Sequence, residues 1–113
     1  MSAITTHILD TSRGRPAGGV RVVLEIRGFE DWEILGQGRT DDDGRLKDLL
    51  PDTADLRAGA YRLTFHTADY FVAQGVESFF PEVVITFLVA DAAAHYHVPL
   101  LLSPFGYSTY RGS

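Results

Sequence analysis

The sequence has 113 residues, of which 45% are hydrophobic and 22% charged, proportions typical of one folded globular domain and not of a disordered segment. A formal net charge of −5 with no basic stripe argues against nucleic acid as a partner. The absence of cysteine excludes disulfides, thiolate catalysis and zinc held by cysteine.

The sequence also lacks the signals of membrane insertion and secretion. Residues 83–90 form the longest strongly apolar stretch, which is much shorter than the roughly 20 residues that a membrane-spanning helix needs. Residues 1–4 lack the basic start and apolar core of a secretory signal. We therefore expect no membrane partner and a cytoplasmic location.

In chain order, short segments of alternating apolar and polar residues predict an all-β protein. Residues 20–27 show most clearly the period of two that a strand buried on one face requires. Residues 61–66 repeat it, and residues 83–89 are rich in β-branched side chains. The expected strands cover residues 4–9, 20–27, 32–40, 46–49, 61–66, 83–89, 95–101 and 106–110.

Turn sequences separate these strands, at residues 13–19, 42–44, 51–52, 58–59 and 103–104. Short strands with such regular turns predict a sandwich, and no linker or repeat divides residues 1–113, so we expect one domain. One short helix is expected over residues 68–74, with Thr67 or Asp69 as N-cap and Gly75 at its end. Pro99 cannot donate to a sheet, so we expect a bulge or a strand end there.

His95 and His97 are two residues apart, so on a strand both side chains project from the same face. Such a pair, with a third histidine such as His7, could hold a tetrahedral zinc ion. Alternatively, a reference pKa of about 6.5 suits a metal-free general base at neutral pH. The spacing leaves both interpretations open.

His7 lies in a segment whose alternation places it opposite Ile4 and Ile8. If those two isoleucines face the core, His7 faces outward, where a histidine is readily tolerated. Arg45 follows the tight turn at residues 42–44 and could be a solvated cation. Its planar guanidinium also suits a planar, carbonyl-rich or anionic ligand.

The C-terminal segment differs from a typical frayed tail, because Phe105, Tyr107 and Tyr110 supply apolar surface that a sheet could hold. The final residues, 110–113, then add a cation and a hydroxyl group in Tyr-Arg-Gly-Ser. We expect this segment to be held in place rather than loose.

Five segments together resemble the transthyretin-related 5-hydroxyisourate hydrolases, and they occur in that family's order along the whole chain. They read Thr-His-Ile-Leu-Asp at 6–10, Thr-Asp-Asp-Asp-Gly-Arg at 40–45, Glu-Ser-Phe-Phe-Pro-Glu at 77–82, His-Tyr-His-Val-Pro-Leu-Leu at 95–101 and Gly-Tyr-Ser-Thr-Tyr-Arg-Gly-Ser at 106–113. The histidine block and the terminal block are far more specific than any single histidine.

The resemblance implies a transthyretin-like (prealbumin-like) sandwich of two four-stranded sheets with one short helix. It also implies a homotetramer, a dimer of dimers with ligand sites at the dimer–dimer interface. The implied activity is that of a cyclic amide hydrolase, which opens 5-hydroxyisourate in urate degradation without a metal or other cofactor. A non-catalytic transthyretin-like carrier is the alternative.

The resemblance also implies which residues form the site. The implied catalytic residues are His7, Arg45, His97 and Ser113. Substrate binding is expected to involve His7 and Arg45 together with Tyr110, Arg111 and Gly112. No role is assigned to His95, and Ser113 is expected to hold substrate or water through its hydroxyl or carboxylate group.

Overall fold

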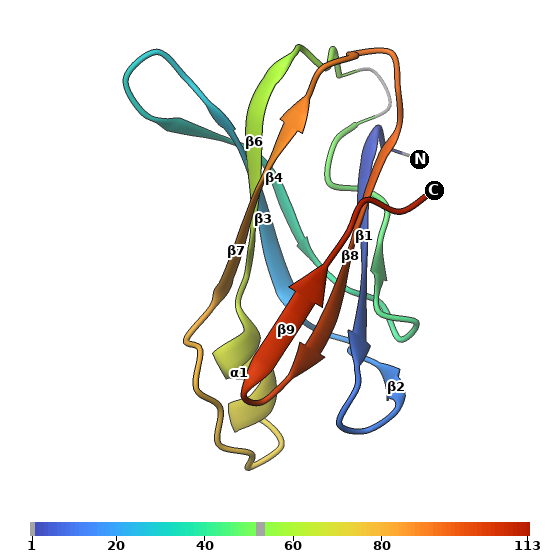
Figure 1. The fold of residues 1–113 in the computed structure, drawn as a ribbon, viewed down its shortest axis with the longest axis vertical. Coiled ribbons are helices and arrows are strands. Elements are labelled where there is room, and N and C mark those ends of the chain that lie inside the picture. Colours follow the sequence, from blue (N-terminus) through green and yellow to red (C-terminus); the bar gives the residue numbers. More distant parts are fainter. Residues whose placement is uncertain (1, 52–53) are drawn as a thin grey trace.

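The computed structural model describes residues 2–51 and 54–113, and over these residues it contains nine strands and one helix (Figure 1). The elements, in chain order, are β1 (Ile4–Asp10), β2 (Arg15–Pro16), β3 (Arg21–Arg27), β4 (Trp32–Arg39), β5 (Arg45–Leu46), β6 (Gly59–Phe65), α1 (Thr67–Val72), β7 (Val83–Val89), β8 (Tyr96–Ser103) and β9 (Gly106–Thr109). No helix in these two ranges has the length and apolar character that crossing a membrane requires.

The strands form two sheets that face each other, which confirms the predicted sandwich with one short helix (Figure 1). We call the sheet with strand order β2-β1-β8-β9 the first sheet and the sheet with order β4-β3-β6-β7 the second sheet. In the described part of the chain the first sheet has five strands rather than four, because β5 also pairs with β1. The two short strands β2 and β5 share one edge of β1, where they pair with different residues.

Two segments differ from the predicted strands. The expected strand at residues 46–49 is reduced to Arg45–Leu46, because Leu49 and Leu50 are both buried and successive side chains of a regular strand cannot face the same core. The expected turn at residues 13–19 contains the short strand β2. The expected turn at residues 51–52 lies partly outside the described residues.

The core lies between the sheets, and strand alternation decides which side chains enter it. Ile4 and Ile8 of β1 are fully buried, as is Leu100 of β8, and all three belong to the same cluster. Because alternate residues of a strand face opposite sides, His7 and His97 lie on the outer face of the first sheet. The expectation that His7 faces outward is confirmed.

Pro99 does not end its strand, contrary to the prediction of a bulge or a strand end. Its carbonyl oxygen accepts a hydrogen bond of 2.7 Å from Thr109 Oγ1, so this side of Pro99 faces β9. The missing N–H faces β9 too, because the N–H and C=O of one strand residue point to the same neighbour. The pairing with β9 stops at Leu100, whereas the pairing with β1 runs through Pro99 without a shift.

Helix α1 is tied to the first sheet by the buried carboxylate of Asp10, which accepts a hydrogen bond of 2.7 Å from Tyr70 Oη. The predicted N-caps are wrong: the cap position is His66, and Thr67 is itself the first helical residue, with a buried side chain. Gly75 follows the helix with a φ of 70°, a conformation that favours glycine, as the prediction required.

Candidate active site

A cavity of about 270 Å³ opens on the outer face of the first sheet, where strands from both ends of the chain meet. The parallel pairing of β1 with β8 sets Thr5 opposite His97, and the pairing of β1 with β5 sets His7 opposite Arg45. The residues that line the cavity are Thr5, Thr6, Arg45, Lys47, His95, His97 and Ser113. Three of the four predicted catalytic residues are therefore brought together.

Thr5 links the two histidines of the cavity. Its Oγ1 atom lies 2.8 Å from His97 Nδ1 and 3.3 Å from His95 Nε2. Thr5 is buried, so these contacts are sheltered from water. The ring of His97 is therefore held by its Nδ1 side, which leaves Nε2 as its remaining polar atom.

The surroundings of His97 favour the uncharged form of its imidazole ring. Partial burial lowers its pKa from the reference value of 6.5, and the nearby positive charge of Arg45 lowers it further. His95 and His7 act in the same direction, while a hydrogen bond with the Thr5 backbone acts in the opposite one. At neutral pH the ring is therefore a base and not a cation.

Arg45 is positioned by the turn that precedes it. The Asp41 carboxylate accepts hydrogen bonds from the backbone N–H groups of Asp43 and Arg45, at 2.9 and 3.0 Å. The hydrogen bond from Arg45 is also the main cause that lowers the pKa of Asp41. Gly44 completes the turn with a φ of 74°, which delivers Arg45 to the edge of β1.

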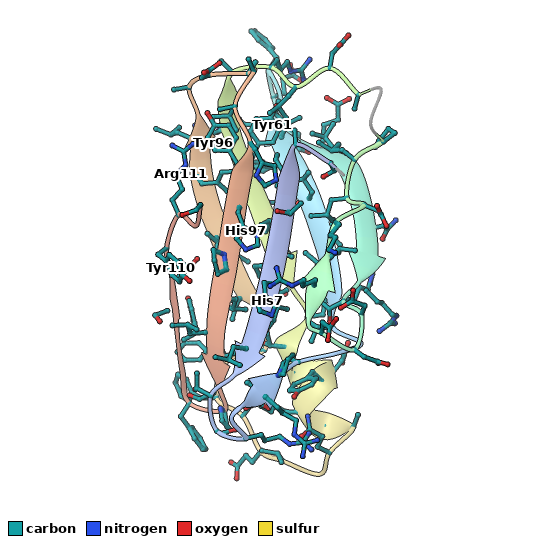
Figure 2. All side chains as sticks on the ribbon, turned by 90° about the vertical axis from the view of Figure 1, so that its right-hand side faces the viewer. His7, Tyr61, Tyr96, His97, Tyr110 and Arg111 are labelled. Atoms are coloured by element: carbon teal, nitrogen blue, oxygen red, sulfur yellow. The ribbon has the colours of Figure 1, made fainter. Side chains whose placement is uncertain are left out.

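His7 lies on the same outer face as His97, further along β1, as Figure 2 shows. It pairs with Arg45 across the β1–β5 edge and is half-buried. It does not line the cavity itself, but it is close enough to contribute to the lowered pKa of His97.

The C-terminal segment returns to β8 after the interruption at Pro99. Gly112 N donates a hydrogen bond of 2.8 Å to the His97 carbonyl oxygen, and this bridge brings Ser113 to the cavity. A Cβ atom on Gly112 would lie 2.7 Å from His97 Cδ2 and 3.2 Å from Pro99 Cγ. Only glycine lets the segment pass this close to the imidazole ring.

Tyr110 and Arg111 are not brought into this cavity. Both line a separate cavity of about 230 Å³, at the margin of the sandwich between β7, β8 and β9. The Arg111 guanidinium carbon lies 4.5 Å from the centre of the Tyr96 ring, a cation–π contact. In Figure 2 the labels of Tyr110 and Arg111 accordingly lie to one side of His97.

No group of three or more histidine, aspartate or glutamate side chains in residues 2–51 and 54–113 is arranged to hold a metal ion. His7 therefore does not complete the His95–His97 pair in the way that the zinc interpretation required. The geometry is that of two imidazoles joined by a threonine hydroxyl group.

Three residues of the cavity, Thr5, Thr6 and Lys47, were not predicted from the sequence. Thr5 could have been found, because it shares the outward face of β1 with His7 and is two residues from it. Lys47 gave no signal, because it follows the short strand β5 in a segment without regular alternation.

The family model described as the HIUase/Transthyretin family matches residues 4–112. The chain belongs to this family. The resemblance seen in the sequence motifs is thereby confirmed over nearly the whole length of the chain.

The chain is similar both to 5-hydroxyisourate hydrolases and to a transthyretin solved with thyroxine. The chain is 49% identical to a 5-hydroxyisourate hydrolase of Caulobacter vibrioides, and the match covers all of both chains. It is 42% identical to the solved 5-hydroxyisourate hydrolase of Klebsiella pneumoniae, with a TM-score of 0.84 over 97% of this chain and 92% of that one. It is 31% identical to a sea bream transthyretin solved with thyroxine, with a TM-score of 0.91 over 98% and 95%.

These two structural comparisons show that backbone similarity does not distinguish a 5-hydroxyisourate hydrolase from a transthyretin. The transthyretin superposes at least as well as the hydrolase, although it is less similar in sequence. Function therefore has to be argued from the side chains of the site.

Proposed function

We propose that the chain hydrolyses 5-hydroxyisourate to 2-oxo-4-hydroxy-4-carboxy-5-ureidoimidazoline in urate degradation, as a cyclic amide hydrolase of one domain spanning residues 1–113. The observation that carries the proposal is that the His97 imidazole and the Arg45 guanidinium lie in one outward cavity, where burial and the Arg45 charge lower the pKa of His97. The relatives named as 5-hydroxyisourate hydrolases, at 49% and 42% identity, support the same substrate.

His97 acts as the general base. A water molecule in the cavity gives a proton to Nε2 while its oxygen attacks a ring carbonyl carbon of the substrate. Positioned proton transfer of this kind contributes about 10²- to 10⁴-fold to a rate. The same imidazole, now protonated, returns the proton to the ring nitrogen as the C–N bond breaks.

Arg45 stabilises the negative charge that develops on the attacked carbonyl oxygen. It is a fixed cation at the cavity, and its charge acts on the oxyanion more strongly than on the neutral substrate. Ser113 binds substrate or water through its hydroxyl group. His7 assists His97 from the neighbouring position on the same face.

The cavity faces outward, so a neighbouring subunit has to shield it from bulk water. We propose a homotetramer, a dimer of dimers, whose dimer–dimer interface covers the outer face of the first sheet.

Gly112 acts by letting the C-terminal segment approach His97. Within one chain Tyr110 and Arg111 line a different cavity. Their proposed part in substrate binding therefore requires the assembled tetramer.

A carrier function is the alternative, and the high structural similarity to a transthyretin solved with thyroxine favours it. A carrier requires apolar walls for an aromatic ligand. The cavity at His97 instead presents two imidazoles, a guanidinium and an ammonium group, which suit a polar, carbonyl-rich substrate.

The test follows the ultraviolet absorbance of freshly generated 5-hydroxyisourate against its spontaneous decay. The protein should accelerate the decay, and His97→Asn should remove nearly all of the acceleration. Arg45→Ala should lower kcat by about 10²- to 10³-fold, the usual loss for one oxyanion donor. Arg15→Ala, a change of an exposed cation outside the cavity, is the matched control.

A wild-type protein that leaves the decay rate unchanged would exclude the hydrolase. Binding of thyroxine without any hydrolysis would favour the carrier.

A further inference from the structure

Three side chains meet at one hydroxyl group on the outer face of the β1–β8 pair. Thr5 Oγ1 lies within hydrogen-bond distance of His97 Nδ1 and of His95 Nε2, at 2.8 and 3.3 Å. A threonine hydroxyl group has one proton to donate, and a neutral imidazole has one N–H donor and one lone-pair acceptor. The two contacts are therefore coupled, because Thr5 can donate to only one of the two rings.

Two arrangements of the protons satisfy both contacts when the rings are neutral and also give the Thr5 proton an acceptor, since the two imidazole nitrogens are the partners of Thr5 Oγ1. In the first, His97 Nδ1–H donates to Thr5, and Thr5 donates to the lone pair of His95 Nε2. In the second, His95 Nε2–H donates to Thr5, and Thr5 donates to His97 Nδ1. The first leaves a lone pair on His97 Nε2, whereas the second leaves a proton there.

The surroundings of His97 favour the first arrangement. The ring is held at Nδ1 by Thr5 and meets Gly112 on its Cδ2 side, so Nε2 is the polar atom that serves the cavity. Arg45 and Lys47 line that cavity, and both side chains can only donate hydrogen bonds. A lone pair on Nε2 can accept from either of these cations, whereas an N–H group there would repel them and could donate only to Ser113 or to water.

We infer that Thr5 and His95 are positioning residues that keep the proton of His97 on Nδ1 and its lone pair on Nε2. The inference deepens the proposed function and rests on it, since only this tautomer can take a proton from water at Nε2. Thr5, which is buried, transmits the effect of His95, which is itself exposed at the edge of the same cavity.

Nitrogen-15 NMR of the full-length protein, labelled at histidine, tests the tautomer without reference to activity. At a pH where His97 is neutral, its Nε2 should give the signal of a nitrogen without hydrogen, and its Nδ1 that of a protonated nitrogen. Loss of a signal in His97→Asn assigns the resonances. A protonated Nε2 in the wild-type protein would overturn the inference, even if the protein hydrolyses 5-hydroxyisourate.

Thr5→Val removes the hydroxyl group with little change of shape. We expect a shift of the His97 tautomer and a fall in kcat of about 10- to 100-fold, the range known for removal of a residue that orients a metal-bound histidine. KM should change little, because Thr5 acts through His97. Thr5→Ser keeps the hydroxyl group and should restore both the tautomer and kcat; wild-type values in Thr5→Val would refute the role of Thr5.

His95 is tested by two variants at an exposed position, where folding should be unaffected. His95→Ala removes the acceptor, which frees the Thr5 proton for His97 Nδ1, so part of the His97 population should change tautomer and kcat should fall severalfold. His95→Gln retains an acceptor oxygen and should behave like the wild type. If His95→Ala leaves the tautomer and kcat unchanged, His95 has no positioning role.

If the wild-type protein shows the expected tautomer but no hydrolysis, the proposed function fails and the inferred hydrogen-bond network does not. The two conclusions are therefore separable by experiment.

Discussion

His97 is surrounded by groups that each restrict it in a different way. Thr5 holds Nδ1, and Gly112 limits the space on the Cδ2 side. Arg45 disfavours a second positive charge nearby, which together with burial lowers the pKa of the imidazole. Position, orientation and protonation of a single ring are thus set by residues from three separate parts of the chain.

The lowered pKa of His97 predicts the pH dependence of the reaction. A general base works in its neutral form, so kcat/KM should rise as the pH increases through the pKa of His97 and become constant above it. The midpoint of this rise, which we call the acid limb, should lie below the reference pKa of 6.5. In Arg45→Gln it should move upward, because the Arg45 charge is one of the causes of the shift.

Measured pH profiles of the wild type and of Arg45→Gln check this expectation, and an NMR titration of His97 gives the same pKa independently. An acid limb at or above 6.5 in the wild type would contradict it.

Gly112→Ala should impair catalysis more than folding. The added Cβ atom would come within 2.7 Å of His97 Cδ2, so the ring or the C-terminal segment has to move. Because small displacements of catalytic groups can cost about 10²-fold, we expect kcat/KM to fall by one to two orders of magnitude.

Gly106→Ala is the control for this change, since its Cβ atom would meet only Ser103 Oγ, at 3.7 Å. Steady-state kinetics and thermal unfolding of both variants separate the two effects. Equal activities in the two variants would show that the close approach at His97 is unimportant.

At the scale of elements, alternation was the most informative signal in the sequence. It predicted β1, β3 and β6 nearly to their ends, because each has one face in the core, and β-branched composition did the same for β7. It failed for the segment after β5, where Leu49 and Leu50 enter the core from irregular backbone. The predicted N-cap of α1 was also wrong, because Thr67 is the first residue of the helix and its side chain is buried in the core.

The predicted site separated into two parts for a reason that the sequence could not supply. Residues 110–113 are continuous in sequence, but Pro99 offers no N–H group where Tyr110 would have paired with β8. The segment rejoins β8 only at Gly112, so Ser113 reaches the cavity while Arg111 stacks on Tyr96. Local patterns do not reveal how a proline affects a neighbouring strand.

Gly44→Ala should destabilise the turn that positions Arg45. Gly44 has a φ of 74°, which costs other residues about 1 to 2 kcal/mol, and an added Cβ atom would also clash with the Ile8 carbonyl oxygen. The clash should add about 1 to 3 kcal/mol, as overpacking usually does. The free energy of unfolding and kcat should both fall.

Gly14→Ala isolates the backbone effect, because Gly14 has a similar φ of 66° and its Cβ atom would meet nothing within 4 Å. Denaturant unfolding of both variants should show a clearly larger loss for Gly44→Ala. Equal losses of unfolding free energy in the two variants would mean that the turn at Gly44 accommodates the added methyl group without a steric clash.

At the scale of the whole molecule, the outer face of the first sheet combines polar site residues with aliphatic ones. Leu9 and Leu101 pair in register on β1 and β8 and lie on the same face as His7 and His97. Leucine side chains beside an open polar cavity are suited to contact with another subunit. This is the face that the proposed tetramer covers.

Leu101→Glu should therefore dissociate the proposed tetramer and abolish activity while the sandwich stays folded. A charge on this face would be buried without a partner in the assembly, but it is exposed to water in the free subunit. Ile34→Glu, an exposed position on the second sheet, is the control and should leave the assembly intact. Sedimentation velocity and circular dichroism measure the two properties; a dissociated but fully active Leu101→Glu would refute the assembly.

The parallel pairing of β1 with β8 also determines when the site can form during folding. The hydrogen bond between Thr5 and His97 joins residues 92 positions apart, so closing it costs more chain entropy than any hairpin in the molecule. During synthesis β1 is made long before its partner strand β8, so this pairing is among the last that can form. Recovery of enzymatic activity after refolding would then report the joining of these two strands, which backbone spectroscopy of the other strands would miss.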